Sequence, residues 1–480
     1  MKQCTPANKQ DPPLVFDLDG TLLATDAFVE QFFVKWHSLP YRLIGMLLLS
    51  TWRPAALKSS LAADVSLCWS AMPWRPAVVH LLENARTNAR MTVLATAADR
   101  VVARQAAEYL GGFDEVLASD GIRNLQGATK SEALVERFGA RGFDYVGDSM
   151  ADLPVWACAR AGWVARSSPR LRRRLSAAGI PIQELSEAPA QRGALFAALR
   201  PLHWLKNAAL ILPLAAAHQL AHIAVWPYLL LAMISFSAAA SAVYLFNDLT
   251  DVQDDRKHPV KRFRPLATGG LWIWNAISAC ALLSGLALLA CIPCGPQALL
   301  LLLAYALLAA AYCLLLKSRT WIDIACLLGF YMIRIAVGAS VAGISISTWF
   351  LAACVTGFLS LSLGKRHSEL LVRSGSNDPH SKRRGYAAGD LPLLRLLGQI
   401  SGYLSCCVVA AYSFSSNSFI LYRHPWAFLV AAVLLAVANW RFWDRQSPLL
   451  LCDDPLRGVL RDPILLILAV ASIVIVVLAT

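Results

Sequence analysis

The sequence lacks the features that mark several common classes of protein. Its cysteines number 12, but no second pair joins Cys291-Ile292-Pro293-Cys294 to complete a zinc site, so we interpret them as packing residues. The net charge is +13, yet neither finger spacing nor a basic module interleaved with aromatic residues is present, and we expect no nucleic-acid partner. Residues 1–13 form a polar tail without the apolar segment of a signal peptide, so we expect the amino-terminal part to stay in the cytoplasm.

Apolar residues are what the chain has in excess. They make up 57% of its 480 residues, and the mean hydropathy of +0.51 is too high for a soluble protein. From about Trp204 onward, apolar segments of roughly 20 residues recur, and each is long enough to cross a hydrocarbon core of ~30 Å. We predict nine membrane helices, near residues 204–222, 225–246, 271–292, 296–316, 320–343, 347–364, 396–415, 424–443 and 462–480.

Basic residues gather in alternate loops between these segments. The cation-rich stretches are 256–264, 317–319, 365–384 and 441–461, whereas the opposite side carries essentially Arg423. Loops of the first kind face the cytoplasm in membrane proteins. We therefore expect a multi-pass protein of the inner (cytoplasmic) membrane, in contact with membrane lipids, with its amino-terminal domain in the cytoplasm.

The chain divides into two domains by composition. Residues 14–165 are mixed in character, and residues 204–480 contain the apolar segments. Between them, residues 166–203 form a connector whose basic run, 166–174, would suit anionic headgroups. The same run also fits a solvated last helix of the first domain, and the sequence leaves the two interpretations open.

Acidic and polar motifs follow short apolar strands in the first domain. The strand-like segment 14–16 leads into Asp17-Leu18-Asp19-Gly20-Thr21, where glycine permits a tight turn. Three further motifs follow in order along the chain: Thr96 after residues 91–95, Lys130 in Gly127-Ala128-Thr129-Lys130, and Asp148 and Asp152 in Gly147-Asp148-Ser149-Met150-Ala151-Asp152. Together they resemble the four motifs of the haloacid-dehalogenase phosphohydrolase superfamily.

This resemblance implies an α/β Rossmann-like fold with a helical cap at about residues 24–90. It implies that Asp17 attacks phosphorus and that Asp19 protonates the leaving oxygen and then activates water. It also implies that Asp17 and Asp148 hold Mg²⁺, that Asp152 supports them, and that Thr96 and Lys130 neutralise the transferring oxygens. Within the cap, residues 39–52 are apolar but too short to span a bilayer, and they either dip into the interface or form the core of the cap.

A cluster of acids and then bases follows the second apolar segment. Asp251 and Asp255 are four residues apart on one helical face, and Asp248 comes three residues earlier. Bare carboxylates bind a diphosphate poorly, but Mg²⁺ bridges the two anions. The bases Lys261, Arg262 and Arg264 are suited to neutralise a departing diphosphate. The alternative is a solvated charged loop.

The stretch Asn247-Asp248-Leu249-Thr250-Asp251-Val252-Gln253-Asp254-Asp255 resembles the first signature of the UbiA superfamily of intramembrane prenyltransferases, and the resemblance covers about residues 200–480. It implies an all-α nine-helix transmembrane bundle around a central cavity, in which the acids hold the Mg²⁺ diphosphate of a polyprenyl donor. A second acidic motif of the superfamily is reduced here, because Asp323 is present but the position four residues later is Leu327.

Residues 200–207, 255–265 and 364–370 look like the decaprenyl-phosphate phosphoribosyltransferase branch. That branch implies phosphoribosyl pyrophosphate as donor and polyprenyl phosphate as acceptor. The candidate substrate-binding residues are Asn247, Lys206, Lys261, Arg262, Arg264, Lys317, Asp323, Arg334, Lys365 and Arg366. Lys317 also satisfies the positive-inside bias, and Lys365 and Arg366 also fit a surface ion pair with Glu369. Arg334 lies deep in an apolar segment, where a cation costs about 2.5–3.5 kcal/mol, so function is favoured there.

Three functions fit these observations. The first is a bifunctional enzyme that joins phosphoribose to polyprenyl phosphate and then removes the sugar phosphate. The second is a prenyltransferase that uses a polyprenyl diphosphate and an aromatic acceptor, with an independent phosphatase. The third is a membrane-anchored scaffold, which the intact acids of both domains disfavour.

Overall fold

The computed structural model describes residues 11–38, 54–185, 193–258, 260–317, 319–374, 386–444 and 461–479. The chain forms two compact units, one of Met1–Leu199 with Tyr244–Cys280 and one of Arg200–Val243 with Ala281–Thr480. The apolar run 39–52, for which two interpretations were open, lies outside the described residues.

A six-stranded parallel sheet forms the centre of the first unit, in the order β3-β2-β1-β4-β5-β6. The strands are β1 (Leu14–Phe16), β2 (Thr92–Asp99), β3 (Glu115–Ser119), β4 (Asp144–Gly147), β5 (Gly162–Val164) and β6 (Ile182–Glu184). Phe16 of β1 pairs with Leu94 of β2 and with Val146 of β4. Residues that follow these three strands therefore meet at one edge of the sheet.

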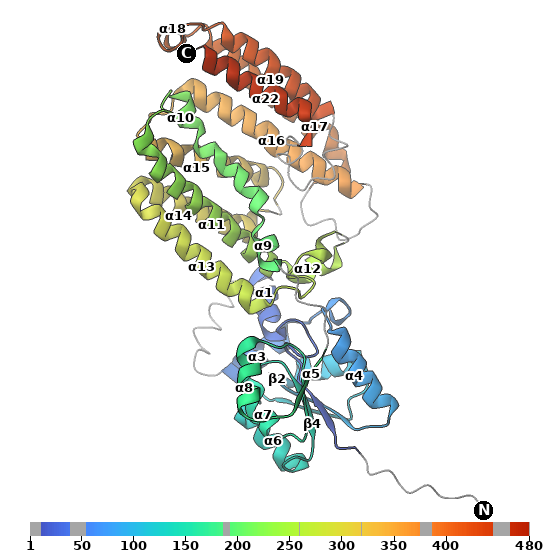
Figure 1. Ribbon diagram of the computed structural model, residues 1–480. Coiled ribbons are helices and arrows are strands. Elements are labelled where there is room, and N and C mark those ends of the chain that lie inside the picture. Colours follow the sequence, from blue (N-terminus) through green and yellow to red (C-terminus); the bar gives the residue numbers. More distant parts are fainter. Residues whose placement is uncertain are drawn as a thin grey trace, which may run out of the picture. The chain divides into compact units, whose positions relative to one another are not determined.

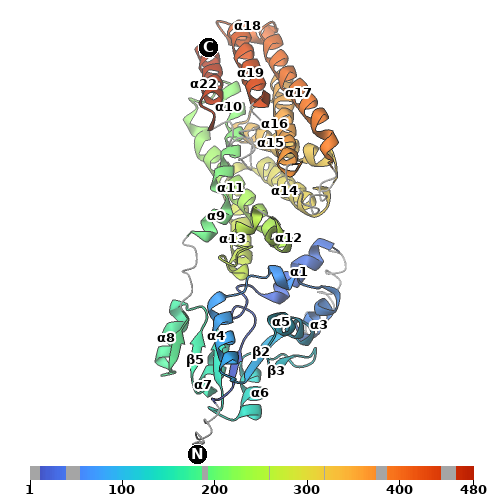
Figure 2. The same cartoon turned by 90° about the vertical axis from the view of Figure 1, so that its right-hand side faces the viewer.

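Helices cover both faces of this sheet (Figures 1 and 2). They are α4 (Pro76–Thr87), α5 (Arg100–Leu110), α6 (Ala128–Phe138), α7 (Leu153–Cys158) and α8 (Pro169–Ala177). Alternate residues of β1 point to opposite faces, as strand geometry requires. Leu14 and Phe16 pack with α4 and α5, whereas Val15 packs with α6, α7 and α8.

The first domain extends beyond residue 165, the end that we predict for it from the sequence. Leu171 and Leu175 of α8 are buried in the same core as Val15, and β6 adds the sixth strand beside β5. The basic run 166–174 therefore includes a helix of this domain, as the second interpretation of the connector had it. The sequence pattern missed this because a three-residue edge strand carries almost no periodic signal.

The cap is smaller than the predicted range of 24–90. Helices α1 (Ala27–Ser38) and α3 (Pro54–Asp64) lie between β1 and β2 in the sequence, and Lys35 of α1 forms an ion pair of 2.6 Å with Asp64 of α3. Helix α4, which the prediction included in the cap, buries Val78 and Leu82 in the core beside β1. Its apolar spacing did not reveal which partner it packs against.

Long apolar helices make up most of the second unit and lie alongside one another (Figure 1). They are α11 (Trp226–Thr250), α13 (Ile273–Cys291), α14 (Pro296–Ala311), α15 (Ile322–Ala342), α16 (Thr348–Ser374), α17 (Leu391–Tyr412), α19 (Ala427–Asp444) and α22 (Pro463–Leu478). Seven helical segments in the described ranges are long and apolar enough to cross a membrane, and α22 is a shorter apolar helix. The predicted fold class is confirmed, and the number of nine helices is approximate.

The first predicted span, 204–222, is not one continuous helix. It contains the 3₁₀ helix η3 (Pro201–Leu210) followed by the short helix α10 (Leu212–Ala216). Pro213 lies in the first turn of α10, where its missing N–H group prevents a hydrogen bond back to the preceding turn. Composition alone did not distinguish this broken segment from a spanning helix.

A close helix contact in the bundle depends on Gly398 of α17. A Cβ atom added at Gly398 would lie 2.0 Å from Cζ2 of Trp443 in α19. Trp443 is buried, and its Nε1 donates a hydrogen bond to Ser360 Oγ of α16 at 3.2 Å. The indole therefore has no room to move away without losing a buried hydrogen bond.

We expect Gly398→Ala to lower the unfolding free energy of the bundle by about 1–3 kcal/mol, the usual range for overpacking. Gly285→Ala in α13 is the matched control, because a Cβ atom there meets nothing within 4 Å. It should be neutral or stabilising by up to about 1 kcal/mol, since alanine favours helices. Thermal unfolding in detergent measures both changes, and equal midpoints for the two variants would contradict the expectation.

Candidate active sites

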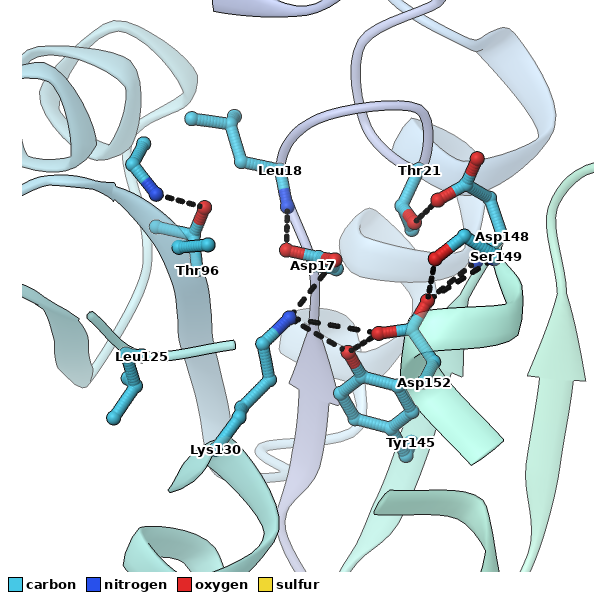
Figure 3. Close-up of polar contacts among 12 residues, drawn as sticks. Asp17, Leu18, Thr21, Thr96, Leu125, Lys130, Tyr145, Asp148, Ser149 and Asp152 are labelled. Carbon is cyan, nitrogen blue, oxygen red and sulfur yellow. Dashed lines mark hydrogen bonds and ion pairs between the residues drawn. The ribbon is translucent and has the colours of Figure 1, made fainter. Parts of the chain in front are cut away.

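The predicted phosphatase residues gather at one edge of the sheet (Figure 3). Asp17 follows β1, Asp148 follows β4, and Thr96 lies in β2. Lys130 comes from the first turn of α6, and Asp152 ends the 3₁₀ helix η2 (Met150–Asp152). The parallel topology therefore brings together side chains that are more than 100 residues apart in the sequence.

Lys130 is the central cation of this site. It is 2% exposed, and its Nζ lies 2.9 Å from Asp17 Oδ2 and 3.6 Å from Asp152 Oδ1. Burial by itself would lower the pKa of Lys130, but the carboxylates of Asp17 and Asp152 outweigh that effect and the pKa is raised. The ammonium group therefore stays charged and is directed at the candidate nucleophile.

Asp152 is held in place by four hydrogen bonds. Its Oδ2 accepts from the backbone N of Asp148 at 3.2 Å, from the backbone N of Ser149 at 3.1 Å and from Ser149 Oγ at 3.0 Å. Its Oδ1 accepts from the hydroxyl of Tyr145 at 2.7 Å, and Lys130 Nζ donates to that same hydroxyl at 3.0 Å. Asp152 thus fixes the loop that carries Asp148.

Three carboxylates form a group that could hold a metal ion. Oxygens of Asp17, Asp148 and Asp152 lie within 4.8 Å of one another, and no other such group of three occurs in the described part of the chain. Burial, with repulsion from Asp152, raises the pKa of Asp148 to about 8 and, despite Lys130, that of Asp17 to about 6. Oxygen ligands and excess negative charge fit Mg²⁺.

Gly20 gives the loop after β1 room to approach Asp148. Its φ is +77°, in the region that favours glycine, and a Cβ atom there would lie 2.2 Å from Asp148 Oδ2. Thr21 Oγ1 donates to the other oxygen of Asp148 at 3.5 Å. The glycine predicted from the turn is therefore required by the site itself.

Asp19 and Thr96 each accept a hydrogen bond from a backbone N–H group, and their catalytic roles stay predictions. Asp19 Oδ1 accepts from the backbone N of Ala27 at 2.8 Å, and burial, with the nearby charge of Asp26, raises the pKa of Asp19 well above its usual value. A raised pKa makes Asp19 easier to protonate than an exposed aspartate, which suits a general acid. Thr96 is fully buried, and its hydroxyl accepts from the backbone N of Ala98 at 3.1 Å.

The acid-rich segment of the transferase spans two helices. Asp248 lies in the last turn of α11, Asp251 follows it, and Asp255 lies in α12 (Val252–Lys257). Helical hydrogen bonding continues across the junction, because Asp255 N donates to Asp251 O at 2.8 Å. Asp248 and Asp255 are buried, each 3% exposed, whereas Asp251 is partly exposed.

Arg264 joins two of these acids. Its Nη1 lies 2.5 Å from Asp255 Oδ2 and 3.1 Å from Asp248 Oδ1. Burial raises the pKa of Asp255 to about 6, although Arg264 and Lys261 oppose that effect. The guanidinium thus contacts one oxygen of each of these two carboxylates. In the described part of the chain, the acids at 248, 251 and 255 do not form a close group like that of Asp17, Asp148 and Asp152, so their metal-binding role stays a prediction.

The remaining predicted residues of this segment lie around the acids. Lys261 and Arg262 belong to the 3₁₀ helix η5 (Lys261–Phe263), and the guanidinium of Arg262 lies 4.8 Å from the ring centre of Phe263. Asn247 O accepts from the backbone N of Asp251 at 3.0 Å. The roles of Lys261, Arg262 and Asn247 in substrate binding therefore stay predictions.

A second polar group lies in the bundle and includes the reduced acidic motif. Asp323 of α15 and Arg366 of α16 form an ion pair, and their side chains are 0% and 2% exposed. Tyr386 donates its hydroxyl to Asp323, and Arg366 Nη2 donates to the hydroxyl of Tyr312 at 2.7 Å. Arg366 also pairs with Glu369. The two predicted substrate-binding residues therefore neutralise each other.

Arg334 is a buried cation inside the apolar part of the bundle. It is 4% exposed, and its Nε donates to Asn207 Oδ1 at 2.8 Å. Its Nη1 donates to Phe330 O at 2.7 Å, and its guanidinium lies 4.9 Å from the ring centre of Tyr305. These contacts of Arg334 are with neutral groups, which suits a residue that awaits an anion.

The other predicted cations are partly exposed. Lys206 Nζ lies 3.5 Å from His203 Nδ1, and both belong to η3. Lys317 follows the π-helical turn Tyr312–Leu316, which comes directly after α14. Lys365 lies in α16 beside Arg366. Their substrate-binding roles remain predictions.

Four polar residues of these groups were not predicted from the sequence. They are Tyr145, Tyr312, Tyr386 and Asn207. A tyrosine in a buried apolar segment must find a partner for its hydroxyl, and that rule was the available signal. It indicates that a partner exists, but it does not identify which residue that partner is.

Comparison with known proteins supports both halves of this description. Residues 208–449 match the UbiA prenyltransferase family, and residues 14–156 match haloacid dehalogenase-like hydrolase. An uncharacterised protein of Sinorhizobium fredii is 31% identical over 455 residues, which cover 94% of this chain and 87% of that protein.

Two shorter matches concern the membrane part. Decaprenyl-phosphate phosphoribosyltransferase of Mycobacterium tuberculosis is 32% identical over 283 residues, which cover 58% of this chain and 90% of that protein. The nodulation protein NoeC of Azorhizobium caulinodans is 33% identical over 248 residues, which cover 51% of this chain and 78% of that protein. The chain therefore belongs to the UbiA prenyltransferase family and carries a haloacid dehalogenase-like hydrolase domain on the amino-terminal side of its membrane bundle.

Proposed function

We propose that the chain is a bifunctional membrane enzyme. Its membrane domain transfers 5-phosphoribose from phosphoribosyl pyrophosphate to polyprenyl phosphate and releases diphosphate. Its phosphatase domain then removes the 5-phosphate from the lipid-linked sugar. The bonds balance, because the C1–oxygen bond to diphosphate breaks while an oxygen of the lipid phosphate bonds to C1.

The buried pair of Asp323 and Arg366 is the observation that supports this choice of substrates. In the superfamily pattern, two acidic motifs serve the diphosphate, whereas here the acid of the second motif already contacts a buried arginine. A carboxylate so paired is a poor metal ligand, because separating a buried ion pair is costly. One Mg²⁺ diphosphate and two monophosphates need fewer acids and more cations than two metal-binding motifs provide.

A relative points in the same direction. The Mycobacterium tuberculosis protein named decaprenyl-phosphate phosphoribosyltransferase is matched over 90% of its length. Its name gives a phosphoribosyl group and a polyprenyl phosphate, and we carry both to this chain as part of the proposal. The Arg334 guanidinium, which contacts neutral groups, is a candidate for the lipid phosphate.

In the transferase, Asp248, Asp251 and Asp255 would hold Mg²⁺, which would neutralise the diphosphate as it leaves. Arg264 contacts two of these acids and would add positive charge beside the diphosphate. Lys261 and Arg262 are close enough in the sequence to add positive charge to the leaving group.

In the phosphatase, Asp17 would attack phosphorus while Lys130 and Thr96 bind the transferring oxygens. Asp19, whose pKa is raised well above its usual value by burial, would donate the proton to the leaving oxygen. It would then accept a proton from the water that hydrolyses the aspartyl phosphate. Asp148 and Asp152, with Asp17, would hold Mg²⁺ beside the phosphoryl group.

The proposed function also implies where the protein lies in the cell. The lipid substrate requires a membrane, and phosphoribosyl pyrophosphate is a soluble anion that would enter from the cytoplasm. The basic loops support an inner-membrane protein whose phosphatase domain and acid-bearing loop face the cytoplasm.

We expect Asp17→Asn to stop removal of the sugar phosphate, because the amide cannot act as the nucleophile. Purified wild-type protein supplied with both substrates should yield the dephosphorylated ribosyl lipid. The variant should accumulate the phosphorylated form, and mass spectrometry of the lipid products distinguishes the two.

Asp120→Asn is the control for this substitution, because Asp120 is an exposed acid of the same domain that hydrogen-bonds to its own turn. It should leave the product pattern unchanged. If Asp17→Asn gives the wild-type products, the coupling of the two reactions is wrong. Consumption of a polyprenyl diphosphate with an aromatic acceptor would instead support the alternative prenyltransferase.

We expect Asp255→Asn to reduce ribosyl transfer by about 100-fold, because it removes a metal-ligand charge and the partner of Arg264. The rate at which the same protein hydrolyses p-nitrophenyl phosphate should change less than about twofold, since a substitution in one site has little effect on a separate site. Asp254→Asn, at the adjacent and partly exposed acid, is the matched control. Equal transfer rates for the two variants would remove Asp255 from the site.

A further inference from the structure

A buried ion pair links the phosphatase domain to the loop that carries the transferase acids, and both partners belong to the same compact unit. Helix α1 supplies Glu30, which is 0% exposed, and helix α12 supplies Arg256, which is 8% exposed. Arg256 Nη2 donates to Glu30 Oε1 at 2.6 Å, and Nη1 donates to Oε2 at 2.7 Å. Two parallel hydrogen bonds fix orientation as well as distance.

The surroundings of this pair are built to hold it. Arg256 Nε donates to Ala267 O at 2.9 Å, so a third donor of the guanidinium has a partner. Gln253 Nε2 donates to Glu30, and Met72 Sδ lies 3.3 Å from Arg256 Nη1. An ion pair with this many buried partners is held in one geometry, unlike an exposed ion pair on the surface.

Further contacts continue along the start of α1. Trp274 Nε1 donates to Asp26 Oδ2 at 3.0 Å. Gly269 has a φ of +75°, and a Cβ atom there would lie 2.6 Å from Cβ of Ala24. After Ala267, the loop that follows α12 and the first turn of α13 therefore also approach the phosphatase domain closely.

Helix α1 is the anchor of this contact and α12 is the element that it holds. Helix α12 has six residues, too few to be stable by itself, so it depends on the end of α11 that precedes it and on its contacts with α1. Helix α1 has 12 residues, and its side chains Ala27, Val29 and Phe33 are buried, with Ala27 in the core that also contains β1 and α4. The first turn of α1 is fixed by Asp26 Oδ1, which accepts from Val29 N at 3.0 Å.

Arg256 is adjacent to Asp255 in the sequence. The orientation of α12 therefore determines the directions of both side chains. Asp255 contacts Arg264, and Arg256 contacts Glu30. Consecutive helical residues point in directions about 100° apart, so a helix fixed by Arg256 presents Asp255 at one angle. If Arg256 were released, α12 could rotate and carry Asp255 away from the other acids.

We propose that Glu30, a residue of the phosphatase domain, is a positioning residue for the transferase reaction and holds the acid-bearing helix α12 through Arg256. This inference rests on the proposed transferase function. It makes the phosphatase domain a structural part of the diphosphate site in addition to its own catalysis.

The test compares Glu30→Gln, Arg256→Gln and the double variant in the full-length protein. Each protein is assayed for ribosyl transfer from phosphoribosyl pyrophosphate and, separately, for hydrolysis of p-nitrophenyl phosphate. Glu30→Gln should raise the KM for phosphoribosyl pyrophosphate about tenfold and leave p-nitrophenyl phosphate hydrolysis within about twofold. The double variant should be no worse than the poorer single variant, because both changes remove one interaction.

Asp64→Asn is the matched control, since it breaks the other ion pair of α1, between Lys35 and Asp64, and leaves Glu30 intact. It should leave both reactions within about twofold of wild type. An unchanged KM in Glu30→Gln overturns the proposal. Loss of both activities together also overturns it, because that result would mean a general effect on folding.

A binding measurement separates this proposal from the proposed function. Calorimetry measures the affinity of wild type and of Glu30→Gln for inorganic diphosphate in the presence of Mg²⁺. If wild type transfers no ribose, the proposed function fails, but binding that is about tenfold weaker in Glu30→Gln still supports the role of Glu30. Equal affinities in the two proteins overturn that role whatever the donor is.

Discussion

The burial of ionisable carboxylates is the constraint on which both sites depend. Burial raises the pKa of Asp17 and of Asp255 to about 6 in each case, because an ionised acid is poorly solvated inside the protein. Each acid group therefore includes a basic side chain. Lys130 Nζ lies 2.9 Å from Asp17, and Arg264 Nη1 lies 2.5 Å from Asp255. These cations allow the acids to be gathered before a metal or a phosphate arrives.

The three cations differ in how strongly they are committed to their acids. Lys130 contacts Asp17, Asp152 and the hydroxyl of Tyr145, so three groups hold it in the site. Arg264 is partly exposed and can exchange two acids for an anion. Arg366 is 2% exposed and also contacts Glu369 and Tyr312, so its pairing with Asp323 is the least reversible. The number of acids in the sequence therefore overstates the number that are free to bind metal.

The sequence predicts contacts between residues that recognisable motifs mark, even when they are far apart in the chain, and it misses contacts whose partners no motif marks. Asp17, Asp148 and Asp152 meet as predicted because each follows a strand of one parallel sheet. The Asp323–Arg366 pair joins two helices, and neither residue has a local feature that names the other. The span predicted at 204–222 failed for another reason, since hydropathy measures composition and does not detect the break before Pro213.

The boundary between the domains illustrates the same limit and has a chemical consequence. Composition separates the chain near residue 204, but residues Tyr244–Cys280 form one compact unit with the phosphatase domain. The acids that define the transferase family thus lie in a segment whose packing is completed by a different domain. Glu30 and Arg256 are 226 residues apart, and each would be a buried unpaired charge if the other were lost. The phosphatase domain and this segment therefore depend on each other for their packing.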